Sequence, residues 1–242
     1  MIPLDIFALR DVNRKGKLGV MKNKVVMISG SSMGIGRETA YKFAIDKAKV
    51  IVTYCKDKAD GEKTYKTCRE LGASDALLVK LDVKDNKNIA SVVKRVIEKF
   101  KRIDILINNA GVACWKPLKD QSVTDIENQI RTNLEGLIKL TKACLPYVKD
   151  KIINIASGAG QTGYADLTVY CATKFGVRGF TQSLAEEIKN IKIYAVNPDM
   201  TATKLSGFQG RPPEEVAQVI LNTAKGIYKS PSGSDIDVWE YY

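Results

Sequence analysis

The stretch that decides the fold reads Val25-Val26-Met27-Ile28-Ser29-Gly30-Ser31-Ser32-Met33-Gly34-Ile35-Gly36-Arg37. It begins with an apolar run typical of a buried strand and continues into a glycine-rich turn and the start of a helix. Glycines at 30, 34 and 36 let the backbone turn sharply and approach a pyrophosphate, which the amides at a helix N-terminus can bind. The spacing departs from Gly-x-Gly-x-x-Gly, so a purely structural turn stays open at this point.

Short β-rich runs alternate with longer amphipathic segments from Val25 onward, which predicts an α/β fold with a parallel sheet covered by helices on both faces. We expect strands at 25–29, 49–54, 76–81, 103–107, 151–156, 191–196 and 235–239. Helical periodicity predicts helices at 35–47, 60–71, 86–100, 122–148, 168–189 and 213–229. No repeat, low-complexity tract or linker divides the chain, so we expect a single domain over residues 21–242.

Residues 1–20 precede the first strand and contain the basic stretch Arg14-Lys15-Gly16-Lys17, while Met21 would make a natural translation start. We interpret them as an N-terminal extension without defined structure, with an oligomerisation or targeting arm as the alternative. Asp5 interrupts the apolar stretch near the N-terminus, which argues against a secretory signal. No apolar run approaches the ~20 residues that a bilayer crossing needs. We therefore expect a cytoplasmic protein that is not attached to a membrane.

The composition excludes several classes of function. The chain has 242 residues, a net charge of +11 and no histidine, so a Ser-His-Asp triad or any other imidazole base is excluded. The five cysteines lack CxxC spacing, which predicts reduced thiols and no metal site. Lysines are spread over the predicted helices without interleaved aromatic residues, which favours a solvated basic surface over a nucleic-acid site.

Three polar residues are candidates for chemistry. Ser157 follows the predicted strand 151–156, so its hydroxyl should stand at the carboxyl edge of the sheet, where open α/β sheets bind ligands. Tyr170 and Lys174 are four residues apart on a predicted helix and share one face. Taken alone, each residue could be purely structural: a serine in a turn, a half-buried tyrosine or a solvated lysine. Together, a nearby ammonium would favour the phenolate form of a tyrosine, whose pKa is normally about 10.

These motifs together resemble the short-chain dehydrogenase/reductase family, whose nucleotide turn carries the same glycine spacing. Ser157 precedes Tyr170 by thirteen positions and Asn133 lies in the preceding helix, which is similar to the family's Asn, Ser, Tyr, Lys tetrad. The stretches Asp82-Val83 and Asn108-Asn109-Ala110-Gly111 resemble its adenine-contacting pair and its Asn-Asn-Ala-Gly motif. The resemblance covers 25–239 and implies an NAD(P)-dependent oxidoreductase with a doubly wound (Rossmann), seven-stranded parallel sheet in the order 3-2-1-4-5-6-7.

The resemblance also implies roles for individual residues. Tyr170 would be the general acid/base while a hydride moves between the nicotinamide and a carbonyl or alcohol substrate, and Ser157 would hold the substrate oxygen. Lys174 would bind the nicotinamide ribose, and Asn133 would anchor a water that relays protons to it. The implied cofactor contacts are Gly30, Ser32, Met33, Gly34, Ile35, Gly36, Lys56, Asp82, Val83, Asn109, Ala110, Gly111, Tyr170, Lys174, Pro198 and Thr203.

The end of the second strand bears on the choice of cofactor. Val52-Thr53-Tyr54-Cys55-Lys56 carries no carboxylate for the ribose hydroxyls, and Lys56 could bind a 2′-phosphate. We therefore expect NADP(H). NAD(H) is the alternative, because Met33 stands where the family often has a phosphate-binding base.

The segment 197–203, Asn-Pro-Asp-Met-Thr-Ala-Thr, resembles the family's Asn-Pro-Gly segment, with Asp199 in place of the usual glycine. Thr203 is in register to contact the nicotinamide carboxamide, and Thr201 is its rival. The loop from Thr203 to Pro212 is short, which is compatible with an open site for a bulky or carrier-bound substrate and equally with neutral loop variation. We expect a 3-oxoacyl, sugar or small-ketone substrate.

The resemblance implies a homodimer or homotetramer that pairs the helices carrying Asn133 and Tyr170, while the altered C-terminus, 237–242, weakens the case for a tetramer. A non-catalytic dinucleotide-binding sensor or scaffold is the alternative function, although an intact tetrad argues against it. A nucleic-acid binder, which only the net charge would suggest, is not expected.

Overall fold

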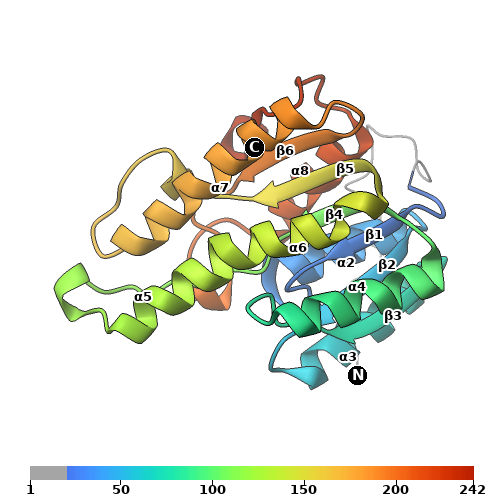
Figure 1. The fold of residues 1–242 in the computed structure, drawn as a ribbon, viewed down its shortest axis with the longest axis horizontal. Coiled ribbons are helices and arrows are strands. Elements are labelled where there is room, and N and C mark those ends of the chain that lie inside the picture. Colours follow the sequence, from blue (N-terminus) through green and yellow to red (C-terminus); the bar gives the residue numbers. More distant parts are fainter. Residues whose placement is uncertain (1–20) are drawn as a thin grey trace.

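The computed structural model describes residues 21–242, which form a seven-stranded parallel sheet with helices on both faces (Figure 1). The strands are β1 (Val25–Ile28), β2 (Lys49–Tyr54), β3 (Asp75–Lys80), β4 (Ile103–Asn108), β5 (Val148–Ile155), β6 (Lys192–Asn197) and β7 (Asp235–Asp237). Their order, β3-β2-β1-β4-β5-β6-β7, confirms the predicted doubly wound topology. The expected extension over 1–20 lies outside the described residues.

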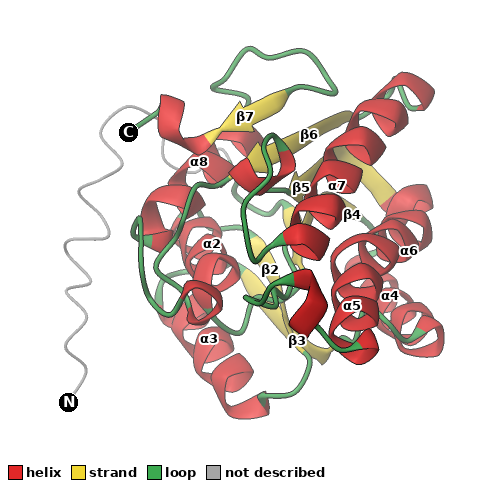
Figure 2. Cartoon of the chain, turned by 90° about the vertical axis from the view of Figure 1, so that its left-hand side faces the viewer, coloured by secondary structure: helices red, strands yellow, loops and turns green. Residues whose placement is uncertain are grey.

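Two layers of helices enclose the sheet, as Figure 2 shows. One layer holds α2 (Gly34–Ile45), α3 (Lys58–Glu70) and α8 (Pro213–Lys225), and the other holds α4 (Asn86–Phe100), α6 (Gly136–Cys144) and α7 (Thr168–Glu187). Successive side chains of a strand point to opposite faces, so β1 supplies both cores. Val26 and Ile28 pack with Phe43 of α2, while Val25 and Met27 pack with residues of α4 and α6.

The strands are all parallel, so their carboxyl ends meet at one edge of the sheet. The chain reverses its winding direction at β1, which lies between β2 and β4. Ligands of doubly wound folds bind in the crevice outside the strand ends at such a switch point. In Figure 2 the molecule is seen from the side to which these ends point.

The single helix predicted over 122–148 is wrong. The segment contains α5 (Val123–Ile130), a π-helical turn (Arg131–Glu135), α6, and a short 3₁₀ turn (Leu145–Tyr147). The helix widens because the N–H of Gly136 bonds to the carbonyl of Arg131, five residues earlier. α6 ends at Cys144, two residues before Pro146, which has no N–H to continue the helical hydrogen bonds. β5 then begins at Val148, before the predicted 151.

The last strand differs from the prediction, whereas the cysteines agree with it. β7 ends at Asp237 and gives way to a 3₁₀ turn (Val238–Glu240), whereas the sequence predicted a strand to 239. The five cysteines are free thiols. Within 21–242 no group of three or more acidic or cysteine side chains is arranged to hold a metal ion. No helix in the described part of the chain combines the length and apolar character needed to cross a bilayer.

Candidate active site

The glycine-rich turn joins β1 to α2 at the switch point. Gly30 has φ +65°, in the left-handed region that favours glycine. A Cβ at Gly36 would lie 2.4 Å from the carbonyl oxygen of Gly30 and 2.5 Å from Nδ2 of Asn109. Only glycine therefore allows the helix, the turn and the end of β4 to approach this closely.

The first turn of α2 presents backbone amides to whatever lies beside it. Met33 occupies the N-cap position without a capping side-chain hydrogen bond, and the first turn carries no acidic residue. Unpaired N–H groups and the positive end of the helix dipole favour an anion at such a position. The turn therefore fits the pyrophosphate of a dinucleotide, in both shape and charge.

Asn109 fastens the glycine turn to the end of β4. Its Nδ2 donates to the carbonyl oxygens of Ser29 and Gly30 at 3.0 and 2.9 Å. The hydroxyl of Ser29 accepts from the backbone N–H groups of Asn109 and Ala110, both at 3.0 Å. These bonds make the end of β4 and the turn one continuous wall.

A cavity of about 1650 Å³ runs along the carboxyl edge, more than the roughly 300–1,000 Å³ of sites for drug-sized ligands. It has room for a dinucleotide together with a substrate. The predicted residues on its wall are Gly30, Ser32, Met33, Gly34, Ile35, Lys56, Asp82, Val83, Asn109, Ala110, Gly111, Ser157, Tyr170, Lys174, Pro198 and Thr203. Gly36 and Asn133 are not on the wall and pack behind it.

Basic side chains lie beyond β2, where a 2′-phosphate would need positive charge, beside the carboxylates of Asp57 and Asp60. Lys56 is exposed and lines the cavity, and the carboxylate that follows it, Asp57, caps α3 by accepting from the N–H of Asp60 at 3.2 Å. Arg37 also lines the cavity, with its Nε 3.0 Å from Glu38. Arg37 was not predicted as a site residue, although a base directly after the last glycine of the turn was a usable signal in the sequence.

Ser157, Tyr170 and Lys174 meet at the ends of β5 and α7. Ser157 begins a short turn after β5, where its Oγ accepts from the N–H of Ala159 at 3.1 Å, and its side chain is hydrogen-bonded to Tyr170. Nζ of Lys174 donates to the carbonyl oxygen of Ile155 at 2.7 Å and lies 5.6 Å from the centre of the Tyr170 ring. The turn after β5 and the first turns of α7 thus bring the three residues together as one group on the cavity wall.

Asn133 lies in the π-helical turn and is 1% exposed. Its Oδ1 accepts from the N–H of Val112 and its Nδ2 donates to the carbonyl of the same residue, both at 2.8 Å. Nδ2 also donates to the hydroxyl of Thr173 at 3.1 Å. These contacts hold the loop that follows β4 against α7, directly beside Lys174.

Burial governs the protonation of the two central residues. It raises the pKa of Tyr170 to about 12, although the hydrogen bond with Ser157 opposes the rise. Burial also lowers the pKa of Lys174 to about 8. In the protein alone burial therefore outweighs any effect of the neighbouring ammonium and keeps Tyr170 in its neutral form, because removal from water disfavours the charged form of both groups.

The segment after β6 is closed by an ion-pair clamp, Asp199–Arg211. Nε and Nη2 of Arg211 donate to the two carboxylate oxygens of Asp199 at 2.8 and 2.9 Å, and Nη1 donates to Glu215 at 2.7 Å. The backbone N–H of Arg211 also donates to the carbonyl of Met200 at 2.8 Å. The charge that replaces the usual glycine at 199 is thus neutralised within the loop.

The two rival threonines of this segment differ in their surroundings. A Cβ at Gly34 would lie 3.2 Å from Cγ2 of Thr203, so Thr203 sits directly against the glycine turn. Thr201 is 6% exposed and its hydroxyl donates to the carbonyl of Asp199 at 2.9 Å. Both line the cavity, but Thr203 is the one beside the turn.

Large apolar side chains on the substrate side were not expected from the sequence. Trp115, Tyr164, Phe208 and Trp239 all line the cavity. They stand in connections that follow different strands and belong to no motif, so only their position after strand ends could have indicated them.

A doubly wound sheet with a glycine turn at its switch point, and a serine, a tyrosine and a lysine on the wall of the same cavity, define an oxidoreductase that uses a nicotinamide dinucleotide. The family model described as short chain dehydrogenase matches residues 24–212. The chain belongs to this family, which confirms the resemblance seen in the sequence.

Its relatives include enzymes with established names. The chain is 34% identical over 225 residues to the NADP-dependent 3-hydroxy acid dehydrogenase of Schizosaccharomyces pombe, covering 83% of this chain and 86% of the relative. It is 33% identical over 242 residues to the 3-oxoacyl-[acyl-carrier-protein] reductase of Thermotoga maritima, covering 90% and 97%.

Solved structures show the same architecture. A short chain dehydrogenase from Burkholderia cenocepacia in complex with NADP superposes with a TM-score of 0.84 at 25% identity, covering 90% of this chain and 96% of that one. A short chain dehydrogenase from Shigella flexneri complexed with NADP gives 0.86 at 22% identity, covering 92% and 100%. The second likeness, at this identity, concerns the fold.

Proposed function

We propose that this protein is an NADP(H)-dependent oxidoreductase that interconverts a carbonyl compound and its alcohol, with Tyr170 as the general acid/base. The observation that carries the proposal is the shared wall: Ser157, Tyr170 and Lys174 line the cavity that the glycine turn also lines. When bound, the nicotinamide supplies or accepts the hydride. The protein's own groups handle the proton and the substrate oxygen.

Tyr170 and Ser157 act on the substrate oxygen. In reduction, the Tyr170 hydroxyl donates a proton to that oxygen while Ser157 donates a hydrogen bond to it. A pKa of about 12 keeps Tyr170 protonated at neutral pH, as an acid requires. In oxidation the tyrosine must accept the alcohol's proton, and the charged form of Lys174 beside its ring then favours the phenolate.

Lys174 and Asn133 support this exchange. Lys174 donates one N–H to the Ile155 carbonyl, which leaves its other donors to bind the ribose hydroxyls. Asn133 is a positioning residue, because both of its strongest contacts hold the backbone of Val112 rather than the cavity itself. The water relay that the family resemblance implies would start from this position.

Several features support NADP(H) over NAD(H). Lys56 lines the cavity, and β2 ends without a carboxylate at the position that would bind a ribose hydroxyl. The Schizosaccharomyces pombe relative is named NADP-dependent, and the Burkholderia cenocepacia structure holds NADP. The relatives' names also support a 3-oxoacyl or hydroxy-acid type of substrate, beside the sugar and small-ketone alternatives.

The assembly and location stay predictions. Ile130, Ile138 and Phe175 are exposed apolar residues on α5, α6 and α7, and they support pairing of two copies through these helices. A homodimer or homotetramer in the cytoplasm, formed by one domain over 21–242, is the arrangement we propose.

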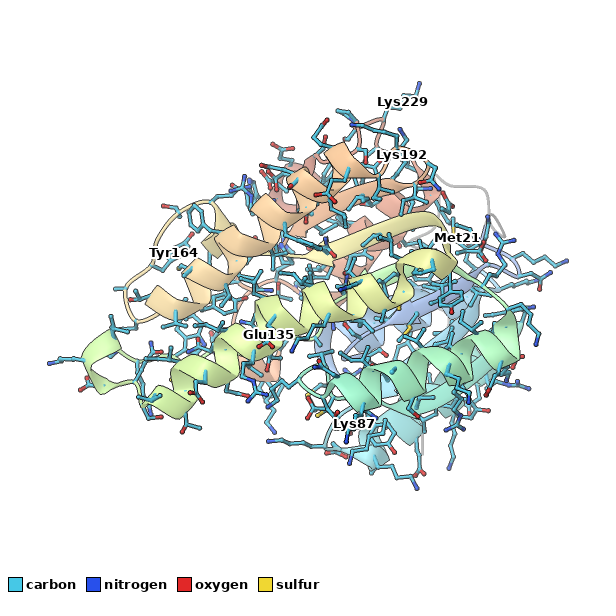
Figure 3. The ribbon with its side chains drawn as sticks, viewed as in Figure 1. Met21, Lys87, Glu135, Tyr164, Lys192 and Lys229 are labelled. Atoms are coloured by element: carbon cyan, nitrogen blue, oxygen red, sulfur yellow. The ribbon has the colours of Figure 1, made fainter. Side chains whose placement is uncertain are left out.

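Fluorescence titration with NADPH and NADH at one salt concentration tests the cofactor. We expect NADPH to bind about tenfold or more tightly, and Lys56→Glu to remove that preference because a carboxylate repels the 2′-phosphate. Lys192→Glu is the matched control, since this lysine begins β6 at the opposite edge of the sheet (Figure 3). Failure of well-folded protein to bind either nucleotide would refute the proposal.

A further inference from the structure

We propose that the substrate is an uncharged carbonyl compound with a bulky apolar body, held by an aromatic rim of Trp115, Tyr164, Phe208 and Trp239. The inference rests on the proposed function and narrows its substrate class. It favours aryl ketones, larger alkyl ketones and 3-oxo esters over sugars and free oxo acids. Each turnover would consume one ketone, one NADPH and one proton, and yield the secondary alcohol and NADP⁺.

The aromatic rim exposes apolar surface that a monomer would otherwise bury. The exposed fractions are 48% for Trp115, 52% for Tyr164, 70% for Phe208 and 37% for Trp239. Clustered exposed aromatic side chains around a concave site mark a surface that binds an apolar ligand. Three of these residues come from the connections that follow β4, β5 and β6, and Trp239 comes from the 3₁₀ turn after β7.

Hydrogen bonds hold parts of this rim in place before substrate arrives. The indole N–H of Trp115 donates to the carbonyl of Leu205 at 2.9 Å, which ties the connection after β4 to the one after β6. The N–H of Lys116 donates to the carbonyl of Asp166 at 3.0 Å, which ties it to the connection that carries Tyr164. In Figure 3, Tyr164 lies in that connection before α7.

The rim reaches the reacting groups through Trp239. A Cβ at Gly158 would lie 3.4 Å from Cζ3 of the Trp239 ring, so the indole covers the residue next to Ser157. A substrate whose oxygen meets Ser157 and Tyr170 would therefore place its body against this indole. The C-terminal turn, in which the sequence showed no function, becomes part of the substrate site.

Two charged groups on the substrate side are already engaged. Asp199 is paired with Arg211, and Lys174 is assigned to the ribose and to the Ile155 carbonyl. Among the described residues that line the cavity beyond Gly111, the remaining ammonium is that of Lys204, which is exposed. A buried carboxylate without a paired cation is strongly disfavoured, so the deep part of the site suits a neutral group.

Two polar side chains on this side have partners within the protein. Gln161 donates its amide to Asp237 at 2.7 Å, and Ser206 donates to the carbonyl of Thr201. A sugar needs several unpaired donors and acceptors, because each of its hydroxyls loses water on binding. Gln161 and Ser206 are therefore engaged elsewhere, and the exposed aromatic side chains of the rim favour an apolar body over a sugar.

The test compares three ketones with NADPH: methyl 4-acetylbenzoate, its free acid 4-acetylbenzoate, and butanone. We expect kcat/KM for the neutral aryl ketone to exceed both others by about tenfold or more, which is the scale of discrimination by an apolar pocket. Trp239→Ala and Trp115→Ala should raise its KM by about tenfold and that of butanone by less, because butanone has a smaller apolar body to lose contact. Trp239→Leu should raise this KM less, because leucine keeps part of the apolar volume of the indole.

Tyr147→Ala is the matched control, since this tyrosine is 37% exposed and lies outside the cavity wall. Circular dichroism and the NADPH dissociation constant report whether each variant is folded and still binds cofactor. Equal reduction of acid and ester, or tryptophan variants with unchanged KM, would overturn the inference while leaving the proposed function intact. If NADPH binds and no ketone is reduced, or if Tyr170→Phe retains turnover, the proposed function and the substrate inference are both refuted.

Discussion

The cavity has a half that would bind the cofactor and a half that would bind the substrate, and the two are lined by different kinds of atoms. The cofactor half is made of backbone: glycines at the turn, the amides of α2, and a strand end fastened by Asn109. The substrate half is made of large side chains carried by separate connections, tied by single hydrogen bonds such as that from Trp115 to Leu205. A constant ligand can be bound by main chain, whereas a variable one is selected by side chains.

The largest expected effect falls where the two halves meet. Tyr170→Phe removes the proton donor, so we expect turnover to fall about 10²- to 10⁴-fold, the usual contribution of general acid catalysis. NADPH binding should be nearly unchanged, because the phenyl ring stays in place. Steady-state rates beside a fluorescence titration measure both, with Tyr147→Phe as control.

The next largest effect is expected from a substitution that disturbs only the cofactor half. Gly36→Ala places a Cβ 2.4 Å from the carbonyl of Gly30, so the turn must shift. We expect NADPH affinity to fall about 100-fold and unfolding free energy to drop by about 1–3 kcal/mol, as overpacking does. Gly179→Ala is the control, because a Cβ there meets nothing within 4 Å. Urea unfolding that shows equal stability for both variants would contradict this account.

The pH dependence of turnover and of stability tests Lys174, which lies where the cofactor half meets the substrate half. Lys174 has a pKa of about 8, so it loses its charge as pH rises through 8, and kcat/KM for NADPH should fall about tenfold per unit above that pH. Stability should move the other way. The unfolded chain holds this proton up to about 10.5, so Lys174 makes unfolding free energy rise between pH 8 and 10.5. A rate profile that stays flat to pH 10 is the contrary result.

The smallest effect concerns the clamp beneath the substrate half. Asp199→Asn weakens the two hydrogen bonds from Arg211, and we expect a loss of about 1 kcal/mol in unfolding free energy because the pair is partly exposed. The segment that carries Thr203 should loosen, raising KM for NADPH a few-fold. A charge swap, Asp199→Arg with Arg211→Asp, should restore part of the loss. Additive effects in this double-mutant cycle would show that the pair is not coupled.

The contrast between the halves also explains how much the sequence could predict. The glycine turn, the strand order and the positions of Ser157, Tyr170 and Lys174 follow from local patterns and from the family resemblance. The pKa of Tyr170 did not follow, because burial is invisible in a spacing of four residues. The pairing of Asp199 with Arg211 and the aromatic rim did not follow either, since each depends on how loops fold back on one another.

The break in the helix 122–148 was unreadable for a related reason. The apolar periodicity of the segment predicted one continuous helix, but Asn133 bonds to Val112 and Thr173, which lie on other elements. Tertiary contacts thus accompany the widened turn and outweigh local helical preference.

Because of that π-helical turn, the number of residues in this segment determines which way Asn133 points. A wide turn accommodates one residue more than regular helix would, and each residue of a helix corresponds to about 100° of rotation. Deleting a single residue between Arg131 and Glu135 would give an unbroken helix of good propensity and rotate Asn133 away from Val112. Homologues and engineered variants should therefore tolerate substitutions here far better than changes of one residue in length.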